Sequence, residues 1–157
     1  MNSIEKQIQV PAPLTRVWRA LTDPAEFEAW FGMRLSGPLV PGARVPCAIV
    51  GTTVDPEVAK AQQQHSGVPY EITVDSVVPR QLFSFRWHPA AVDHDVDYSA
   101  EPVTLVSFAL QENATGVLVS LTESGFDQIP EPRRNVAYSA NNQGWTIMLS
   151  LLERYLR

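Results

Sequence analysis

Glu123 is the residue of this chain whose type and position could most readily do chemistry inside a folded interior. It continues the alternating apolar row of the segment Val117–Ser124, so a strand there would place its carboxyl group on the apolar face. Such a carboxyl group can anchor the polar end of a ligand, or act as a general acid or base. Acid–base catalysis needs at least two convergent polar groups, and the sequence supplies one. We therefore predict a polar anchor at Glu123 and assign no catalytic residue.

Two histidines have polar neighbours. His88 shares with Arg86 the face opposite Trp87, because alternate residues of a strand point to opposite sides. We therefore expect His88 on the surface, unless a bulge before Pro89 turns it inward. His94 is flanked by aspartates in V-D-H-D-V-D, but adjacent loop residues point in different directions and no second histidine stands at ligand-like spacing. We expect a solvent-exposed loop there and no metal.

Other signatures of chemistry are missing from the sequence. Cys47 follows Pro46 in an expected strand, where a small buried hydrophobe is the usual interpretation. The Gly-x-Ser-x-Gly elbow of hydrolases, the glycine-rich phosphate loop and the dinucleotide fingerprint do not occur. We therefore predict no cofactor.

The elements that would position these residues begin with a strand and two short helices. Alternation predicts a strand over Ile4–Val10, and Pro13 suits the first turn of a helix. Asp23 followed by Pro24 is a second helix start, and Gly32 ends that helix.

A series of strands follows. Alternating apolar residues between turn signals predict strands over Arg44–Val50, Tyr70–Val78, Leu82–His88, Val103–Gln111 and Val117–Ser124. The polar segment Val58–Gln64 predicts one or two helical turns, and the role of residues 51–69 stays open. The acidic stretch Pro89–Pro102 is predicted to be a loop.

The chain ends in one long amphipathic helix after Pro132. Its apolar stripe consists of Trp145, Met148, Leu149, Leu152 and Leu156. Burying each of these side chains is worth on the order of 2 kcal/mol. The helix must therefore dock on an apolar surface, and the inward row of the sheet is the one of adequate size.

Composition narrows the class of protein. The 157 residues are 45% hydrophobic and 18% charged, which excludes a disordered chain, and the net charge is −5. No Lys/Arg run exceeds Arg133–Arg134 and no apolar run approaches the roughly 18 residues of a membrane span, so we expect neither nucleic acid nor membrane as a partner. A single cysteine excludes an internal disulfide, and the N-terminus lacks a leader pattern. We predict a cytoplasmic protein.

The order of strand, helix pair, antiparallel sheet and long helix resembles the START-like (helix-grip, SRPBCC) superfamily. Several strings are similar to the bacterial branch of the activator of heat shock protein 90 ATPase homologue family, namely L-T-D-P-A-E-F-E-A-W-F-G (21–32), F-R-W-H-P (85–89), V-D-Y-S-A-E-P (96–102), T-E-S-G-F-D-Q-I-P (122–130) and N-N-Q-G-W (141–145). The resemblance implies an α+β helix-grip fold over residues 1–157 as a single START-like domain. It has a curved antiparallel sheet of about six or seven strands, two short helices after the first strand, and a long C-terminal helix packed across the sheet.

The resemblance implies the fold but does not specify the function. The superfamily spans lipid carriers, hormone receptors, aromatic cyclases and co-chaperone domains, and a shared fold does not fix what a site does. Eukaryotic co-chaperone members carry an additional N-terminal domain that engages the chaperone, whereas this chain starts directly at the first strand. In this fold the first and last strands are neighbours, so Glu123 could pair with Lys6. We favour the alternative that Lys6 reaches water at its strand end.

The candidate site is the cavity that this fold usually encloses between the sheet and the last helix. Its expected ligand-binding residues are Tyr70, Phe85, Trp87, Phe108, Glu123, Trp145, Met148, Leu149 and Leu152. Plain core is the alternative for the apolar ones. Our first hypothesis is binding of a small apolar or aromatic molecule, with Tyr70 and Glu123 as polar contacts. The alternatives are a co-chaperone-like stress-response module that binds a protein partner through its outer surface, at Arg133–Arg134 for example, and a cyclase- or hydrolase-type enzyme that uses Glu123.

Overall fold

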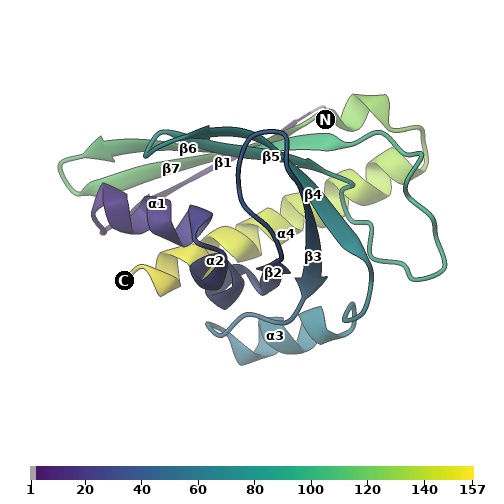
Figure 1. Ribbon diagram of the computed structural model, residues 1–157, viewed down its shortest axis with the longest axis horizontal. Helices are drawn as coiled ribbons and strands as arrows, with labels where there is room; N and C mark the ends of the chain where they lie inside the picture. Colours follow the sequence, from purple (N-terminus) through teal and green to yellow (C-terminus); the bar gives the residue numbers. More distant parts are fainter. Residues whose placement is uncertain (1–2) are drawn as a thin grey trace.

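The computed structural model describes residues 3–157. Over these residues the chain forms a seven-stranded antiparallel sheet in the order β1-β7-β6-β5-β4-β3-β2, and the long helix α4 runs across one face of it (Figure 1). The elements are β1 (Ser3–Val10), α1 (Leu14–Thr22), α2 (Pro24–Phe31), β2 (Met33–Leu35), β3 (Arg44–Ile49), α3 (Pro56–Gln63), β4 (Tyr70–Val78), β5 (Leu82–Trp87), β6 (Thr104–Asn113), β7 (Gly116–Ser124), a 3-10 turn (Phe126–Gln128) and α4 (Arg133–Tyr155). The predicted helix-grip fold is confirmed.

The helix pair after β1 forms for the reasons that the sequence indicates. The Asp23 carboxylate accepts the backbone N–H groups of Ala25 and Glu26, at 2.9 and 3.4 Å, and so caps α2. Gly32 ends this helix with φ +83°, a left-handed conformation that glycine adopts without a Cβ clash. The α2 helix thereby enters the core in one fixed orientation, with Phe27, Trp30 and Phe31 buried.

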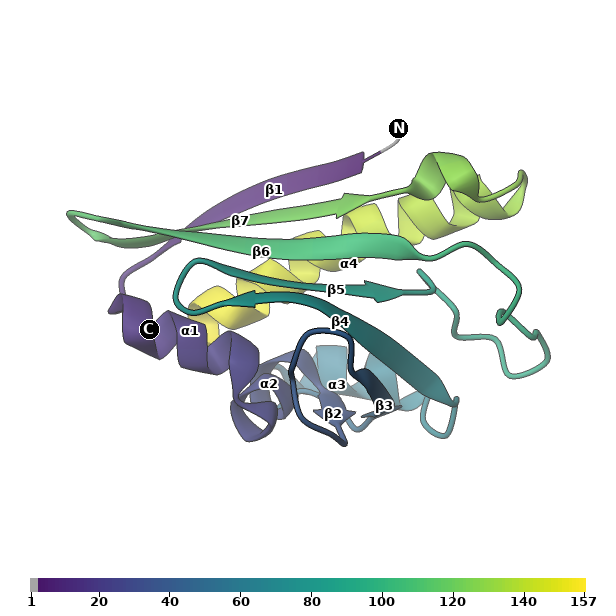
Figure 2. The ribbon, with the colours of Figure 1, turned by 45° about the horizontal axis from the view of Figure 1, so that its top comes forward.

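Buried and half-buried residues alternate along β7, the strand that carries Glu123, as the sequence predicts. In β7 the residues Val117, Val119, Leu121 and Glu123 are buried and their neighbours are half-buried. The strands β5 to β7 curve over α4, and the segment between β5 and β6 projects past the ends of these strands (Figure 2). The short strand β2, which pairs with β3, is an addition to the predicted strands.

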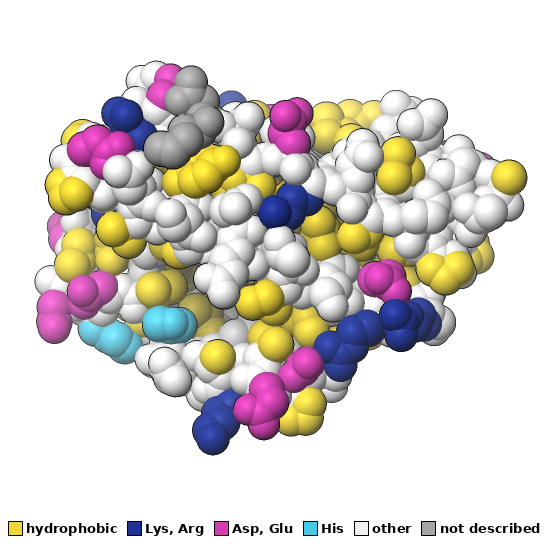
Figure 3. All heavy atoms as spheres, turned by 180° about the vertical axis from the view of Figure 1, so that it is seen from behind, with side chains coloured by type: hydrophobic (Ala, Val, Ile, Leu, Met, Phe, Trp, Pro, Cys, Tyr) yellow, Lys and Arg dark blue, Asp and Glu magenta, His cyan; other side chains and the backbone are white. Residues whose placement is uncertain are grey.

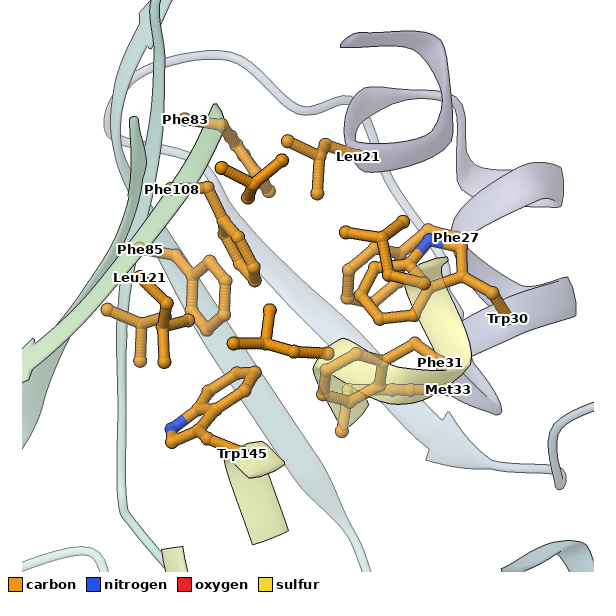
Figure 4. Close-up of a cluster of buried hydrophobic side chains, with 14 of the residues drawn as sticks. Leu21, Phe27, Trp30, Phe31, Met33, Phe83, Phe85, Phe108, Leu121 and Trp145 are labelled. Carbon is orange, nitrogen blue, oxygen red and sulfur yellow. The ribbon is translucent and has the colours of Figure 1, made fainter. Parts of the chain in front are cut away.

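The core contains a cluster of aromatic side chains. Phe83, Phe85 and Phe108 project from the sheet toward Phe27 and Phe31 of α2, and Trp145 approaches from α4 (Figure 4). The Phe27 and Phe31 rings stack with centroids 4.6 Å apart. None of the helices within residues 3–157 is long and apolar enough to cross a membrane.

The segment 51–69 packs beside α2 and α4. Asp55 caps α3 and its carboxylate lies 2.9 Å from the Arg154 guanidinium of α4. Gln62 accepts the Thr52 backbone N–H through its amide oxygen at 2.8 Å and donates to the Phe31 carbonyl at 2.8 Å. Side-chain bonds therefore hold α3 to the elements on both sides of it.

Candidate ligand site

Glu123 lies fully buried at the centre of a shell of hydrogen-bond donors. Its Oε2 accepts the indole N–H of Trp87 at 2.9 Å and the hydroxyl of Thr104 at 2.6 Å. Its Oε1 accepts the indole N–H of Trp145 at 2.7 Å. The Asn141 side-chain amide donates to both oxygens, at 2.9 and 3.1 Å. A carboxylate accepts hydrogen bonds and does not donate them, so these donors match it and offset its removal from water.

No cation compensates this carboxylate among residues 3–157. Lys6 pairs across the sheet with Leu121, and Ile4 stands opposite Glu123. A Lys6–Glu123 ion pair, one of the two outcomes weighed from the sequence, is therefore wrong. Neutral hydrogen-bond donors on β5, β6 and α4 stabilise the carboxylate instead. The donors of β5 and β6 lie close to Glu123 because β6 pairs with both β5 and β7.

The two indoles held by Glu123 form one wall of a small pocket between α2, β5 and α4. Trp87 and Trp145 stack at 26° with ring centroids 5.7 Å apart, and Phe31 meets the Trp145 ring edge-on at 5.9 Å. The pocket has a volume of about 110 Å³ and is lined by Phe31, Trp87, Asn141, Gly144, Trp145 and Met148. We call it the small pocket.

The predicted lining divides into three groups. Trp87, Trp145 and Met148 line the small pocket. Phe85, Phe108, Leu149 and Leu152 are buried in the core behind it, each no more than 2% exposed. Glu123 holds the indoles from behind, and Tyr70 lies elsewhere.

Sequence reasoning missed Phe31, Asn141 and Gly144. All three fall within strings that carry the family resemblance, and the positions of Asn141 and Gly144 gave a further signal. Asn141 stands four residues from the buried Ala137 and Trp145, and Gly144 stands seven residues after Ala137, so both fall on the buried side of α4. A polar residue and a glycine at such places indicate an interrupted core.

A second, larger cavity lies between the strands β3 to β5 and the segment 89–103, which we call the cavity loop. This large cavity has a volume of about 500 Å³. The hydroxyl of Tyr70, one of its lining residues, donates to the His88 carbonyl at 2.5 Å. Burial raises the pKa of Tyr70 well above its usual value. Figure 3 shows a hollow floored by hydrophobic side chains beside histidine side chains. Residues 51–69 contribute Val68 and Pro69 to the large cavity and none to the small pocket.

His88 is not the surface residue that the sequence predicts. It follows the last residue of β5, is half-buried, and lines the large cavity beside the cavity loop. Its Nδ1 is buried without a hydrogen-bond partner. Arg86, which lines the same cavity, pairs with the Asp75 carboxylate, which lowers the pKa of Asp75.

Cys47 and His94 are the remaining residues that the sequence singles out. Cys47 is buried, as predicted, and burial raises the pKa of its thiol to about 12. Within residues 3–157 no group of three or more His, Cys, Asp or Glu side chains is arranged to hold a metal ion. His94 lies on the rim of the large cavity.

Arg133 and Arg134 are bonded to their own chain. Arg133 donates to Glu101 at 3.1 Å and to the Pro89 carbonyl, and its guanidinium lies over the Tyr98 ring. Arg133 therefore fastens both ends of the cavity loop to α4. Arg134 donates to the carbonyls of Ile129 and Asp127 and lies 3.6 Å from the Glu131 carboxylate.

Comparison with known proteins identifies a family whose profile matches most of the chain. The profile described as "Activator of Hsp90 ATPase homolog 1-like protein" matches residues 11–157. A search of curated proteins gives no match.

Solved structures of similar fold cover nearly the whole chain. Protein MLL2253 from Mesorhizobium loti has a TM-score of 0.71 at 23% identity, over 98% of this chain and 96% of that one. DynU16, encoded in the dynemicin biosynthetic locus, has a TM-score of 0.69 at 26% identity, over 99% of this chain and 47% of that one. The Aha1 dimer from Colwellia psychrerythraea has a TM-score of 0.66 at 19% identity, over 99% of this chain and 96% of that one.

The family match extends over all the elements from α1 to α4, including every residue that lines the small pocket. This chain belongs to the Activator of Hsp90 ATPase homolog 1-like family.

Proposed function

We propose that the protein binds a small apolar or aromatic molecule between the sheet and the C-terminal helix, in the small pocket. The observation that carries this proposal is the pair of stacked indoles whose N–H groups are both bonded to Glu123. With their polar atoms occupied, Trp87 and Trp145 present ring surface to the pocket. A preformed aromatic wall of this kind favours an apolar ring, because little ordering remains to be done on binding.

The volume of the small pocket limits the ligand. An engineered cavity of about 150 Å³ in another protein accommodates benzene, so about 110 Å³ suits a single ring or a short aliphatic group. Met148 lines the pocket with a flexible thioether side chain, and its rearrangement would admit a larger ligand. Affinity would come from buried apolar area, with Asn141 as the nearest polar contact.

Glu123 acts in this proposal as a positioning residue. Its two oxygens accept five hydrogen bonds from four side chains. A general acid or base must exchange a proton with the substrate, whereas Glu123 is fully buried behind the indoles and lines neither cavity. The geometry therefore supports binding rather than the cyclase- or hydrolase-type alternative.

The protein-interaction alternative has weaker support. Arg133 and Arg134, the cations considered for such a surface, bond to groups of their own chain. The structural neighbour from Colwellia psychrerythraea is a dimer. On α4 of this chain the exposed large apolar side chains, Val136 and Ile147, are eleven positions apart in sequence, about 16 Å along the helix, and do not form one continuous apolar patch. We therefore retain ligand binding as the conclusion.

Gly144 offers a direct test. A Cβ at this position would meet no atom within 4 Å, so Gly144→Leu should fill the small pocket without displacing the backbone. Ala140→Leu adds a similar side chain at an exposed position of the same helix and is the matched control. In an NMR titration with toluene, we expect saturable shifts of the Trp87 and Trp145 indole resonances in the native protein and the control, and none in Gly144→Leu.

Native mass spectrometry would then identify the natural ligand. Protein purified gently from its own host should carry a small molecule that is absent from the Gly144→Leu variant prepared in the same way. An empty native protein whose indole resonances also ignore toluene would contradict the proposal.

A further inference from the structure

We propose that the large cavity is a second binding site, which takes a planar aromatic molecule carrying a carbonyl oxygen. This inference does not rest on occupancy of the small pocket. The volume of about 500 Å³ lies within the range of roughly 300 to 1,000 Å³ that is usual for small-molecule sites. Such a space admits several fused rings, whereas the small pocket suits one.

The walls of the large cavity come from two sides. The strands β3 to β5 contribute residues of the face that points away from α4, namely Arg44, Glu71, Thr73 and Arg86, and His88 lines the cavity directly after β5. The cavity loop contributes the apolar side chains of Ala91, Val96 and Val103, the Tyr98 ring, and the polar side chains of Asp93, His94, Asp97 and Ser99. The cavity also reaches Tyr70 and Trp87 of the inward row.

The charged groups around the large cavity already have partners. Arg44 lies 3.0 Å from the Glu71 carboxylate, and Arg86 pairs with Asp75. In the cavity loop, Asp97 accepts the Ser99 backbone N–H at 2.9 Å, and Asp93 accepts the Asp95 backbone N–H at 2.9 Å. A ligand therefore need not carry charge to enter, and the apolar and aromatic walls favour a neutral ring system.

His88 supplies the polar contact that fixes the chemistry of the ligand. Its Nδ1 is buried and has no partner, and a buried N–H without an acceptor is rare and costly. The tautomer that avoids this cost carries its proton on Nε2. Within residues 3–157, Nε2 forms no hydrogen bond and is not among the buried unpaired atoms. This cavity-lining side chain therefore has an N–H donor free for a ligand, and its complement is an acceptor such as a carbonyl oxygen.

Aromatic rings beside His88 favour a flat molecule. Tyr70 meets Trp87 edge-on with centroids 5.9 Å apart, and both line the cavity. Tyr98 lines it from the cavity loop, while the Arg133 guanidinium covers one face of the Tyr98 ring at 4.9 Å from its centroid. Arg133 also bonds Glu101 and the Pro89 carbonyl, so the loop wall is held in place before any ligand binds.

A matched pair of ligands tests the proposal on the native protein. 9-Fluorenone and fluorene share a planar tricyclic frame, and only fluorenone has a carbonyl oxygen. Isothermal titration calorimetry should show tighter binding of fluorenone by about 3- to 10-fold, the ratio expected for one hydrogen bond. In His88→Phe, which keeps a flat ring, fluorenone should weaken to the affinity of fluorene, and fluorene should be unaffected.

Gly144→Leu separates the two sites. Because this change fills the small pocket, it should leave fluorenone binding within about twofold of the native value. Loss of fluorenone binding in this variant would place the molecule in the small pocket and overturn the inference. Equal affinity of the native protein for both ligands, or no binding of either at millimolar concentration, would also overturn it. These two outcomes require no variant, so they stand even if His88→Phe folds poorly.

Discussion

Glu123→Gln is the substitution that tests the site most stringently. It keeps the shape of the side chain and replaces one acceptor oxygen with an NH₂ donor. If the NH₂ group stood at the Oε1 position, it would face the Trp145 and Asn141 donors with no acceptor. At the Oε2 position it would face the Trp87 indole, the longer of the two Asn141 contacts, and the Thr104 hydroxyl, which can rotate to accept. We therefore expect the second orientation.

The cost follows from this geometry. In that orientation the Trp87 N–H loses its acceptor, and a buried unpaired donor costs about 1 to 3 kcal/mol. The bonds from Trp145 and Asn141 to the remaining oxygen persist, but they lose the strength that a charged acceptor confers. Burying an amide in place of a carboxylate returns part of the loss. We expect a net destabilisation of about 2 kcal/mol, equivalent to a fall in Tm of about 4 to 8 °C for a chain of this size.

Chemical denaturation measures the loss of stability, and NMR of the indole protons shows which tryptophan has lost its acceptor. The free energy of unfolding should fall in Glu123→Gln, and the Trp87 indole proton should shift upfield more than that of Trp145. Glu112→Gln, an exposed carboxylate at the far end of β6, is the control and should change stability by less than about 0.5 kcal/mol. A Glu123→Gln protein as stable as the native one would refute the reasoning, because desolvation of the carboxylate would then outweigh its donor shell.

Three further predictions concern other groups. Burial raises the pKa of the Cys47 thiol from 9.0 to about 12, so the stability that the buried neutral thiol contributes is complete below pH 9 and is lost as the pH rises toward 12. Urea unfolding of the native protein and Cys47→Ala should therefore show a stability difference that shrinks between pH 9 and pH 12, by at most about 1.4 kcal/mol per pH unit. Arg154→Gln should raise the pKa of Asp55 toward its ordinary 3.8 in a carboxyl NMR titration, and an unchanged value would contradict the ion pair. Arg133→Gln should speed hydrogen exchange in the cavity loop by roughly 10- to 100-fold, and Arg134→Gln, whose bonds lie outside that loop, should not.

The architecture was predictable from the sequence because each element carries its own local signal. The cap at Asp23, the left-handed Gly32 and the alternation of β7 all form as their residue types require. The short strand β2 lacks such a signal, because three residues are too few to show alternation and pairing with β3 defines them.

The candidate site was predictable only in part, since alternation tells which side of a strand a residue faces and not what covers it. This rule placed Glu123 inward correctly, yet its partners come from three elements distant in sequence. The same rule pointed His88 outward, and the fold then laid the cavity loop near it. Phe85 and Phe108 share the face of Trp87 but lie behind it in close-packed core.

The small pocket exists because the apolar stripe of α4 is interrupted, and this interruption has a stability cost that can be measured. Ala137 and Leu152 are buried on the helix, and between them the same face carries Asn141 and Gly144. Glycine in a helix interior is destabilising by roughly 0.5 to 1 kcal/mol relative to alanine, and a Cβ here would meet nothing within 4 Å. Gly144→Ala should therefore raise the free energy of unfolding by about that amount.

The same methyl group would occupy part of the small pocket, so toluene affinity should fall as stability rises. This opposition is the signature of a residue retained for a site at the expense of the fold. A stabilised Gly144→Ala protein that binds toluene as well as the native one would show that Gly144 leaves the pocket free for some other reason. A protein that is not stabilised would show that the added methyl group meets a neighbour after all.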